Sequence, residues 1–400
     1  MKMRTWSPVA AMAALVATLT WLGGVSPAVA QSGPTCKDGA IKVGAVSTIT
    51  GPADFSEVPK AAKAVFDQAN AKGGINGCKI DYTIEDDKAD PQAATQAARD
   101  LVDNKGVAVL TGSASLLDCA VNAGFYARQG VLSIQGLGVD PACYNSPSVS
   151  PVNVGPYVLS TAVLYYASTS LKLDKLCAFF IIIGGTQEAY KQAIVNWEKL
   201  SGKKIHLLDL TMPIQGDYTP FILKARDAGC QGVLFNHIEP GVVQLVKTAE
   251  AQQIKGIDWL FLAPAYTEQV AKALSGTTQP VYAGTEWEPF TDVKSPANKD
   301  WRAALTAAGQ PLTAFTQGGY ESATILIQVL KGINGPVTRA SVTKALHDMK
   351  PITNSLVGTP YYFGPGKTHD SSRATKIVKL VNGKWNVQTP NWVILPQPKG

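Results

Sequence analysis

Residues 41–102 read IKVGAVSTITGPADFSEVPKAAKAVFDQANAKGGINGCKIDYTIEDDKADPQAATQAARDLV, and this stretch decides the fold. Two apolar runs, 41–46 and 80–84, each precede a segment whose apolar residues recur at helical spacing. Gly73-Gly74 ends the first of these segments, and Asp90-Pro91 opens the second with an N-cap residue and a proline at N1. The order strand, helix, strand, helix predicts a parallel sheet covered by helices.

Several motifs in this stretch resemble the start of the periplasmic solute-binding proteins for branched-chain amino acids and related ligands. In order, they are Thr50-Gly51-Pro52, residues 70–77 (NAKGGING), and Asp86-Asp87 followed by Asp90-Pro91. The resemblance continues with weakening clarity to about residue 394. It implies an α/β fold of two doubly wound lobes with parallel central sheets, joined by a three-stranded hinge. It also implies a solute binder that serves an ABC permease in the inner membrane. Composition and periodicity alone indicate only an exported α/β protein.

The first 30 residues have the pattern of a signal peptide. Lys2 and Arg4 supply positive charge, residues 9–22 are mostly apolar, and Ala28-Val29-Ala30 is an A-x-A cleavage site. The apolar run is short for a membrane span. An uncleaved anchor is the alternative, and the cleavage site argues against it. We therefore expect cleavage after Ala30 and a free protein in the periplasm.

The charge of the chain is mild and excludes no small ligand. The formal charge is +6 for the whole chain and +4 without Lys2 and Arg4, and 16% of the residues are charged. No run of lysine or arginine suggests nucleic acid. We expect a monomer with a small-molecule ligand and a permease as its partners.

The alternation of strands and helices continues to the C-terminus. It predicts lobe 1 from residues 31–156 plus 288–358, and lobe 2 from residues 157–287 plus 359–400. The chain would cross between lobes near Val154, Glu286 and Thr359. A hairpin turning at Asn382-Gly383 would end the fold. Further strands are predicted at 107–111, 131–134, 176–183, 204–210, 232–235 and 259–262, and further helices at 118–128, 159–171, 188–200, 217–228, 242–252, 301–308 and 320–330.

All six cysteines lie after the signal peptide, which favours disulfides in an exported protein. Six cysteines allow 15 pairings, and sequence alone does not choose among them. The topology that the resemblance implies favours Cys36–Cys78, Cys119–Cys143 and Cys177–Cys230. For the last pair, two buried free thiols are nearly as good an interpretation. None of the cysteines has metal-site spacing.

A search for catalytic motifs is unproductive. The sequence has no G-x-S-x-G elbow, H-E-x-x-H, Walker loop or G-x-G-x-x-G, and its four histidines do not cluster. A secreted hydrolase that uses Ser113 or Ser115, with His237 as base, is the enzyme alternative. We expect no enzyme, no metal and no cofactor. A sensor that presents its ligand to a membrane receptor is a second binding alternative.

Binding residues are expected in the loops that follow the carboxyl ends of the strands, where open α/β sheets hold their ligands. Facing loops of two lobes would form a cleft that closes on the ligand. The candidates are Ser56, Ser113, Ser115, Leu116, Gln135, Gly136, Leu137, Thr186, Gln187, His237, Glu239, Tyr266, Glu286 and Trp287.

Each candidate also has an ordinary structural interpretation. Ser113, Ser115 and Thr186 suit helix caps, and Gly136 suits a plain turn. Tyr266 and Trp287 could wall the cleft or pack in the core.

The nature of the ligand is inferred from a departure from the family pattern. Aligning residues 259–262 with the family puts Ala265 at or near the acidic position that pairs the ammonium of an amino acid. A buried ammonium without a partner is costly. We therefore expect an organic acid, with aromatic acids among the candidates, in preference to a branched-chain amino acid. Glu239 or Glu286 could supply the acid instead.

Overall fold

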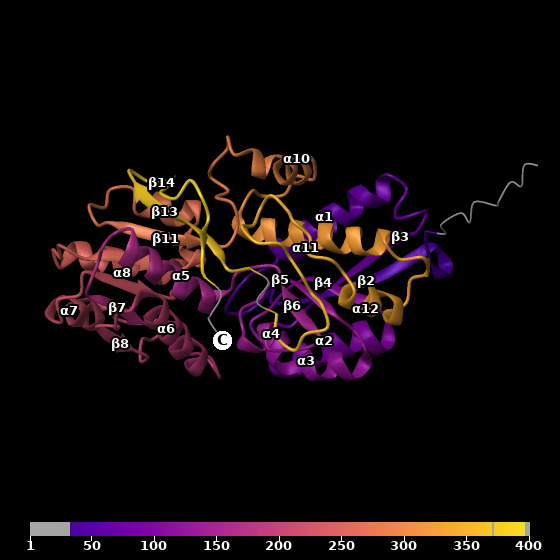
Figure 1. The fold of residues 1–400 in the computed structure, drawn as a ribbon, viewed down its shortest axis with the longest axis horizontal. Helices are drawn as coiled ribbons and strands as arrows, with labels where there is room; N and C mark the ends of the chain where they lie inside the picture. The colour runs from indigo at the N-terminus through magenta and orange to yellow at the C-terminus, as the bar shows by residue number, and fades with distance from the viewer. Residues whose placement is uncertain (1–32, 370–371, 397–400) are drawn as a thin grey trace, which may run out of the picture. The chain divides into compact units, whose positions relative to one another are not determined.

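The computed structural model describes residues 33–369 and 372–396. The predicted signal peptide and its cleavage site lie outside these residues. The described part of the chain contains two main parallel-dominated sheets with helices on both faces (Figure 1). No helix in this part of the chain has the length and apolar character needed to cross a bilayer.

The first sheet has five parallel strands in the order β3-β2-β4-β5-β6. In Figure 1, α1 and α11 lie on one side of this sheet, and α2 and α3 lie on the other. The strands are β2 (Ala40–Ser47), β3 (Lys79–Asp86), β4 (Val109–Ala114), β5 (Ser133–Leu137) and β6 (Val149–Pro151). The helices are α1 (Glu57–Ala71), α2 (Pro91–Arg99), α3 (Asp118–Gln129), α4 (Pro141–Tyr144), α10 (Lys299–Ala307), α11 (Ala314–Lys331) and α12 (Arg339–His347).

Local sequence explains why these elements form where they do. The Asp90 side chain accepts hydrogen bonds from the backbone N–H groups of Gln92 and Ala93, which confirms the predicted N-cap of α2. The predicted strand at 107–111 is shifted in the structure, because β4 extends to Ala114. Ser113 therefore lies within a strand and not in the loop that was expected there.

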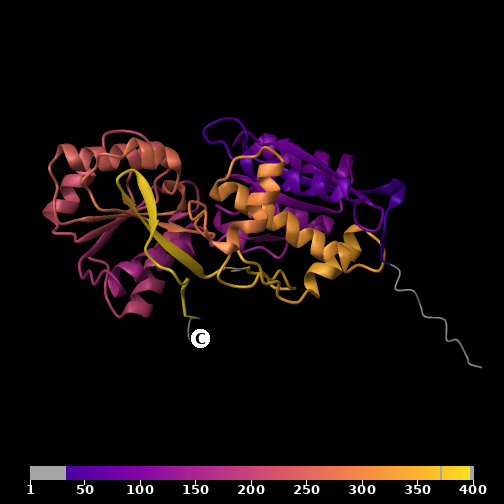
Figure 2. The same ribbon diagram turned by 90° about the horizontal axis from the view of Figure 1, so that it is seen from above.

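The second sheet has five parallel strands in the order β11-β10-β9-β7-β8, extended by antiparallel strands from the C-terminus. Figure 2 shows this C-terminal hairpin, in yellow, along the edge of the sheet next to β11. The strands are β7 (Leu176–Phe179), β8 (Leu207–Asp209), β9 (Gly232–Phe235), β10 (Asp258–Phe261), β11 (Val281–Thr285), β13 (Ala374–Val381), β14 (Lys384–Val387) and β15 (Val393–Ile394). The helices are α5 (Pro156–Thr169), α6 (Gln187–Ser201), α7 (Thr219–Asp227), α8 (Glu239–Ala251) and α9 (Glu268–Ala273).

The hairpin turn is where the sequence placed it. Asn382 and Gly383 have φ values of 49° and 72°, the left-handed conformations that a tight two-residue hairpin turn needs. The predicted strand at 176–183 is too long, because β7 ends at Phe179. The chain from Phe180 to Thr186 is therefore a loop at the carboxyl end of the sheet.

Several short elements complete the described chain. Strands β1 (Pro34–Thr35) and β12 (Gly335–Pro336) pair with each other in a separate two-stranded sheet. Short helices cover Lys37–Gly39 (η1), Asp100–Asn104 (η2), Ala263–Ala265 (η3) and Pro296–Asn298 (η4).

The three predicted disulfides are confirmed. Cys36 bonds Cys78, Cys119 bonds Cys143, and Cys177 bonds Cys230. The interpretation of the last pair as free thiols is wrong. The strands of the first sheet lie within residues 40–151, and those of the second within 176–285 and 374–394. The exact lobe boundaries remain a prediction.

Candidate functional site: the carboxyl-end loops of the two sheets

Ser115 lies at the end of the first sheet and is fully engaged in internal hydrogen bonds. Its hydroxyl donates to Asp87 Oδ2 and accepts from the backbone N–H groups of Leu117 and Asp118 at 2.9 and 2.8 Å. Thr48 Oγ1 donates to the other oxygen of Asp87 at 2.7 Å and accepts from Leu116 N at 3.2 Å. This arrangement supports the capping interpretation of Ser115, because its hydroxyl holds the first turn of α3 against the end of β3.

Beneath these loops, Asp118 and Gln135 form a second buried polar group. The Asp118 carboxylate accepts from Tyr126 Oη at 2.6 Å, Asn122 Nδ2 at 2.9 Å and Gln135 Nε2 at 3.1 Å. Burial raises the pKa of Asp118 to about 6, although these donors oppose the shift. Within the described residues, Gln135 Oε1 is buried without a hydrogen-bond partner. Because this oxygen is buried, it does not line the surface of the rim.

Close packing explains the other candidates at this rim. Ser113 Oγ accepts from Val46 N at 3.1 Å, which joins β4 to β2. A Cβ atom on Gly136 would lie 2.4 Å from Val58 Cγ1, so α1 leaves no room for a side chain there. Leu137 is buried in β5. These contacts support an architectural role for Ser113 and Gly136.

Ser56 places a cation at the same rim. It precedes α1, and its hydroxyl accepts from Lys60 Nζ at 3.0 Å. Lys60 is exposed and makes no ion pair with the described residues. A ligand carboxylate that reaches the start of α1 would therefore find an uncompensated positive charge.

At the second sheet, the candidates are also held by local bonds. Thr186 Oγ1 accepts from Ile183 N at 3.2 Å in the turn before α6, and Gln187, the first residue of α6, is exposed. His237 is 1% exposed, and its Nδ1 accepts from Ile238 N at 3.0 Å. Burial lowers the pKa of His237, so the ring is neutral near pH 7. Glu239 Oε2 accepts from Thr267 Oγ1 at 2.8 Å.

The two aromatic candidates lie in the interior. Tyr266 is 2% exposed, its hydroxyl is 2.7 Å from Thr291 Oγ1, and its ring packs on Phe290. Trp287 is 1% exposed and donates from Nε1 to Glu321 Oε2 at 2.6 Å. Both placements support core packing in preference to a cleft wall.

Glu286 lies where the chain leaves β11, and it connects two of the predicted crossing segments. Its Oε1 accepts from Asn153 Nδ2 at 2.8 Å and from Gly155 N at 2.7 Å. Burial raises the pKa of this carboxyl to about 7, against the effect of both donors. The side chain is 5% exposed, so it holds the crossing together and does not face solvent.

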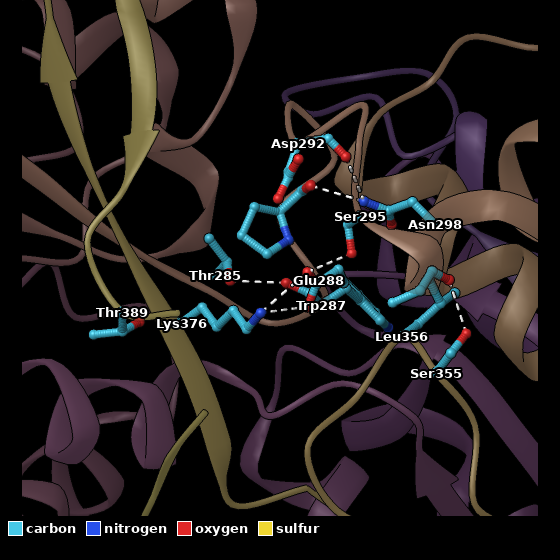
Figure 3. Close-up of polar contacts among 12 residues, drawn as sticks. Thr285, Trp287, Glu288, Asp292, Ser295, Asn298, Ser355, Leu356, Lys376 and Thr389 are labelled. Carbon is cyan, nitrogen blue, oxygen red and sulfur yellow. Dashed lines mark hydrogen bonds and ion pairs between the residues drawn. The ribbon is translucent and has the colours of Figure 1, made fainter. Parts of the chain in front are cut away.

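A buried ion pair beside Glu286 escaped the sequence analysis. Figure 3 shows Lys376 of β13 reaching Glu288, with Nζ 2.8 Å from Oε2. Glu288 Oε1 also accepts from Ser295 Oγ at 2.8 Å, and its backbone N–H donates to Leu356 O at 2.7 Å. Glu288 therefore connects the predicted crossing near Glu286 to β13 and to the segment before Thr359.

The hydrolase alternative finds no support in this geometry. Ser113 Oγ is bonded to the backbone of β2, and the His237 ring is bonded to the backbone of Ile238. The two belong to different sheets, and no hydrogen bond joins them. Within the described residues, no cluster of three or more His, Cys, Asp or Glu side chains could hold a metal ion.

Comparison with known proteins gives a consistent result. The profile of the periplasmic binding protein family matches residues 40–384. The Leu/Ile/Val-binding protein homolog 3 of Brucella melitensis biotype 1 is 27% identical over 360 residues, which cover 86% of this chain and 92% of the relative. The Leucine-, isoleucine-, valine-, threonine-, and alanine-binding protein of Pseudomonas aeruginosa is 25% identical over 318 residues, covering 76% and 82%.

Solved structures share the fold. The isoleucine complex of the branched-chain amino acid transporter substrate-binding protein LivJ from Streptococcus pneumoniae has a TM-score of 0.73 at 16% identity, covering 89% of this chain and 100% of that one. A fatty acid ABC transporter substrate-binding protein from Thermomonospora curvata also has a TM-score of 0.73, at 20% identity, covering 89% and 93%. With most of its length inside the family profile, the chain belongs to the periplasmic binding protein family, whose members bind solutes and do not catalyse reactions.

Proposed function

We propose that this protein is the exported solute-binding component of an ABC importer. It would hold a small organic molecule between the carboxyl-end loops of its two sheets and deliver it to a permease in the inner membrane. Family membership supports the role, and the position of the loops supports the site. The signal peptide, cleaved after Ala30, would place the mature protein in the periplasm as a monomer.

The proposed ligand is an organic acid that lacks an α-ammonium group. The observation that carries this proposal is that Ala265 stands where the family resemblance places an acid, while Glu239 and Glu286, the two alternative acids, already have hydrogen-bond partners. Ala265 is fully buried in η3 and offers no carboxylate. Glu286 is bonded to Asn153 and Gly155, and Glu239 is bonded to Thr267. An ammonium held there would lose its hydration without gaining an ionic partner.

The first sheet supplies a cation at the start of α1, beside the carboxylates of Asp54 and Glu57. Lys60 is exposed at the first turn of α1, where the helix dipole also favours negative charge. Its ammonium would attract the carboxylate of the ligand. The relatives' names include both amino-acid and fatty-acid binders, so the family accommodates ligands with and without an ammonium.

Mass spectrometry of the compound that accompanies the purified protein would identify the ligand directly. Calorimetry should then compare leucine, isoleucine and valine with carboxylic acids of similar size. We expect the acids to bind more tightly, and Lys60→Met to weaken acid binding about twofold to fivefold while leaving the matching primary amides unaffected. Lys63→Met, one turn away on α1, is the control. Tight leucine binding would overturn the ligand assignment, and Glu239→Gln and Glu268→Gln would then show which carboxylate pairs with the ammonium.

A further inference from the structure

The loops at the carboxyl ends of β7, β8, β9 and β10 carry almost no charge. They read FIIIGGT (180–186), LTMPIQGDY (210–218), NHI (236–238) and LAPAYT (262–267). Asp217 is the one charged residue among them, and its carboxylate accepts from Thr219 N at 2.9 Å before α7 begins. The segments before β7, β8 and β10 contain Lys172, Asp174, Lys175, Lys203, Lys204 and Lys255. The charge around these strands is thus concentrated at the amino ends.

Acidic residues begin three of the helices that follow these loops, and two of them are engaged. Glu188 pairs with Lys191 at 2.8 Å, and Glu239 accepts from Thr267. Glu268, at the start of α9, is exposed and makes no ion pair with the described residues. The part of this edge formed by the loops after β7, β8 and β9 therefore suits an uncharged part of a ligand.

Three large apolar side chains are exposed on this uncharged edge. Ile183, Ile214 and Ile238 are 53%, 46% and 41% exposed, and they follow β7, β8 and β9. Scattered exposed apolar residues are normal on protein surfaces. These three are not scattered, because β9, β7 and β8 are consecutive neighbours in the sheet and such strands lie about 4.8 Å apart.

Specific contacts hold the three loops together. Asn236 Oδ1 accepts from Ile181 N at 2.8 Å and its Nδ2 donates to Ile181 O at 2.9 Å, which joins the end of β7 to the end of β9. Tyr218 Oη donates to Ile214 O at 3.0 Å, and its ring lies edge-on to His237 with centroids 5.0 Å apart. The backbone beside each isoleucine is therefore fixed, and their exposure reflects a built surface.

We propose that Ile183, Ile214 and Ile238 form an apolar rim that binds the alkyl chain of the solute, and that the ligand is an aliphatic carboxylic acid. This inference rests on the proposed function and names its ligand class. The carboxylate would lie toward Lys60 of the first sheet, and the chain would extend across β9 and β7 toward β8. Aromatic acids and short branched amino acids would gain less from this rim than a long straight chain, because they have fewer methylene groups to bury on it.

A homologous series of straight-chain acids tests the assignment on the full mature protein. Butanoate, hexanoate, octanoate and decanoate would be titrated by calorimetry, beside leucine and phenylpropanoate. We expect the affinity for the acid to rise about twofold to fourfold with each added methylene. The upper figure corresponds to full burial of the methylene. Ile214→Asn should flatten this rise for the longest acids and leave butanoate almost unchanged.

Val195→Asn is the matched control. Val195 is 39% exposed on α6, the helix that follows β7, but it lies away from the carboxyl-end loops of the sheet. The unfolding temperature without ligand would show that each variant folds. No dependence on chain length, or equal losses from Val195→Asn and Ile214→Asn, would overturn the inference while leaving solute binding intact. Unchanged acid affinity with reduced permease stimulation would assign the rim to permease docking and also overturn it. Failure of every compound to bind would count against the proposed function itself.

Discussion

The sequence analysis named Ser115 as a ligand contact, but its hydroxyl forms its hydrogen bonds within the protein. Its partners are the Asp87 carboxylate and the backbone N–H groups of Leu117 and Asp118. Replacing it with alanine should lower the free energy of unfolding by about 1–3 kcal/mol, because a buried carboxylate and two backbone donors each lose a partner. Urea unfolding would measure this loss. Thr95→Ala, which removes an exposed hydroxyl bonded only to Pro91 O, should change stability by less than about 0.5 kcal/mol.

Buried carboxyls predict an unusual dependence of stability on pH. Burial raises the pKa of Glu286 to about 7 and that of Glu321 to about 8. A glutamate in the unfolded chain titrates near pH 4.3. Between about pH 5 and pH 8, the folded protein therefore retains protons that the unfolded chain has released. The contribution of these two carboxyls to the free energy of unfolding should fall as pH rises through this range, by up to about 1.4 kcal/mol per pH unit for each group. Buried His237 and His369, whose pKa values are lowered by burial, oppose this fall below about pH 6.5, so the fall should be clearest above that pH.

Glu286→Gln isolates one of these groups. The glutamine oxygen can still accept from Asn153 and Gly155, so the crossing keeps its hydrogen bonds while the titration disappears. Urea unfolding at several pH values should give a shallower slope below about pH 7 for the variant than for the natural protein. The same pH dependence in Glu286→Gln as in the natural protein would contradict the assignment.

At the scale of elements, the sequence predicted what depends on local pattern. Apolar periodicity located β2, α1 and α3, and turn chemistry located the hairpin at Asn382. The sequence analysis placed the start of α11 six residues too late, because the helix propensity of Gly318 and Gly319 is low. The structure explains these glycines, since a Cβ on Gly319 would lie 2.0 Å from Val58 O of α1. Such close helix contacts depend on tertiary packing.

The site was harder to predict for a related reason. Most of the candidates lie at or near the carboxyl ends of strands, although Ser113 lies inside β4 and Gln135, Gly136 and Leu137 lie inside β5. Which side chains remain free depends on partners distant in sequence. Ser115 bonds a residue 28 positions away, and Lys376 bonds one 88 positions away. The exposed Ile183 was hidden within an apolar run that resembled one continuous buried strand. Its exposure follows from the end of β7 at Phe179.

The Glu288–Lys376 pair should contribute strongly to the connection between the second crossing and β13. Their side chains are 6% and 10% exposed, so neither charge can regain full hydration alone. Lys376→Met should cost about 3–5 kcal/mol because it leaves Glu288 buried without its cation. Adding Glu288→Gln should recover much of that loss. Lys63→Met, which breaks the exposed pair with Asp67, should cost less than about 1 kcal/mol.

The disulfide between Cys177 and Cys230 joins β7 to the residues before β9, and the two cysteines are 53 positions apart in the sequence. Replacing both with alanine should lower the free energy of unfolding by about 2–4 kcal/mol, because the unfolded chain regains the freedom of this loop. Urea unfolding of the double variant beside the oxidised natural protein would measure it. An unchanged midpoint and slope would show that the bridge adds no stability.

At the scale of the whole molecule, three segments connect the regions that carry the two sheets. They run from β6 to α5, from β11 to α10 and from α12 to β13. Glu286 bonds the first segment, and Glu288 bonds the third. Because these bonds tie the segments to one another, we expect the two regions to move as nearly rigid bodies about one shared hinge. Binding between the facing loops would then close them on the ligand.

Small-angle scattering would test this closure. The protein would be unfolded to release any bound compound, refolded, and measured with and without a saturating acid from the series. We expect a smaller radius of gyration with the acid, because a ligand that contacts both rims favours the closed arrangement over the open one. Glu288→Gln combined with Lys376→Met should loosen the connection to β13 and raise the concentration of acid needed for closure. An identical radius at saturation in the refolded natural protein would mean that binding involves no closure, and the hinge would then serve only to join the two sheets.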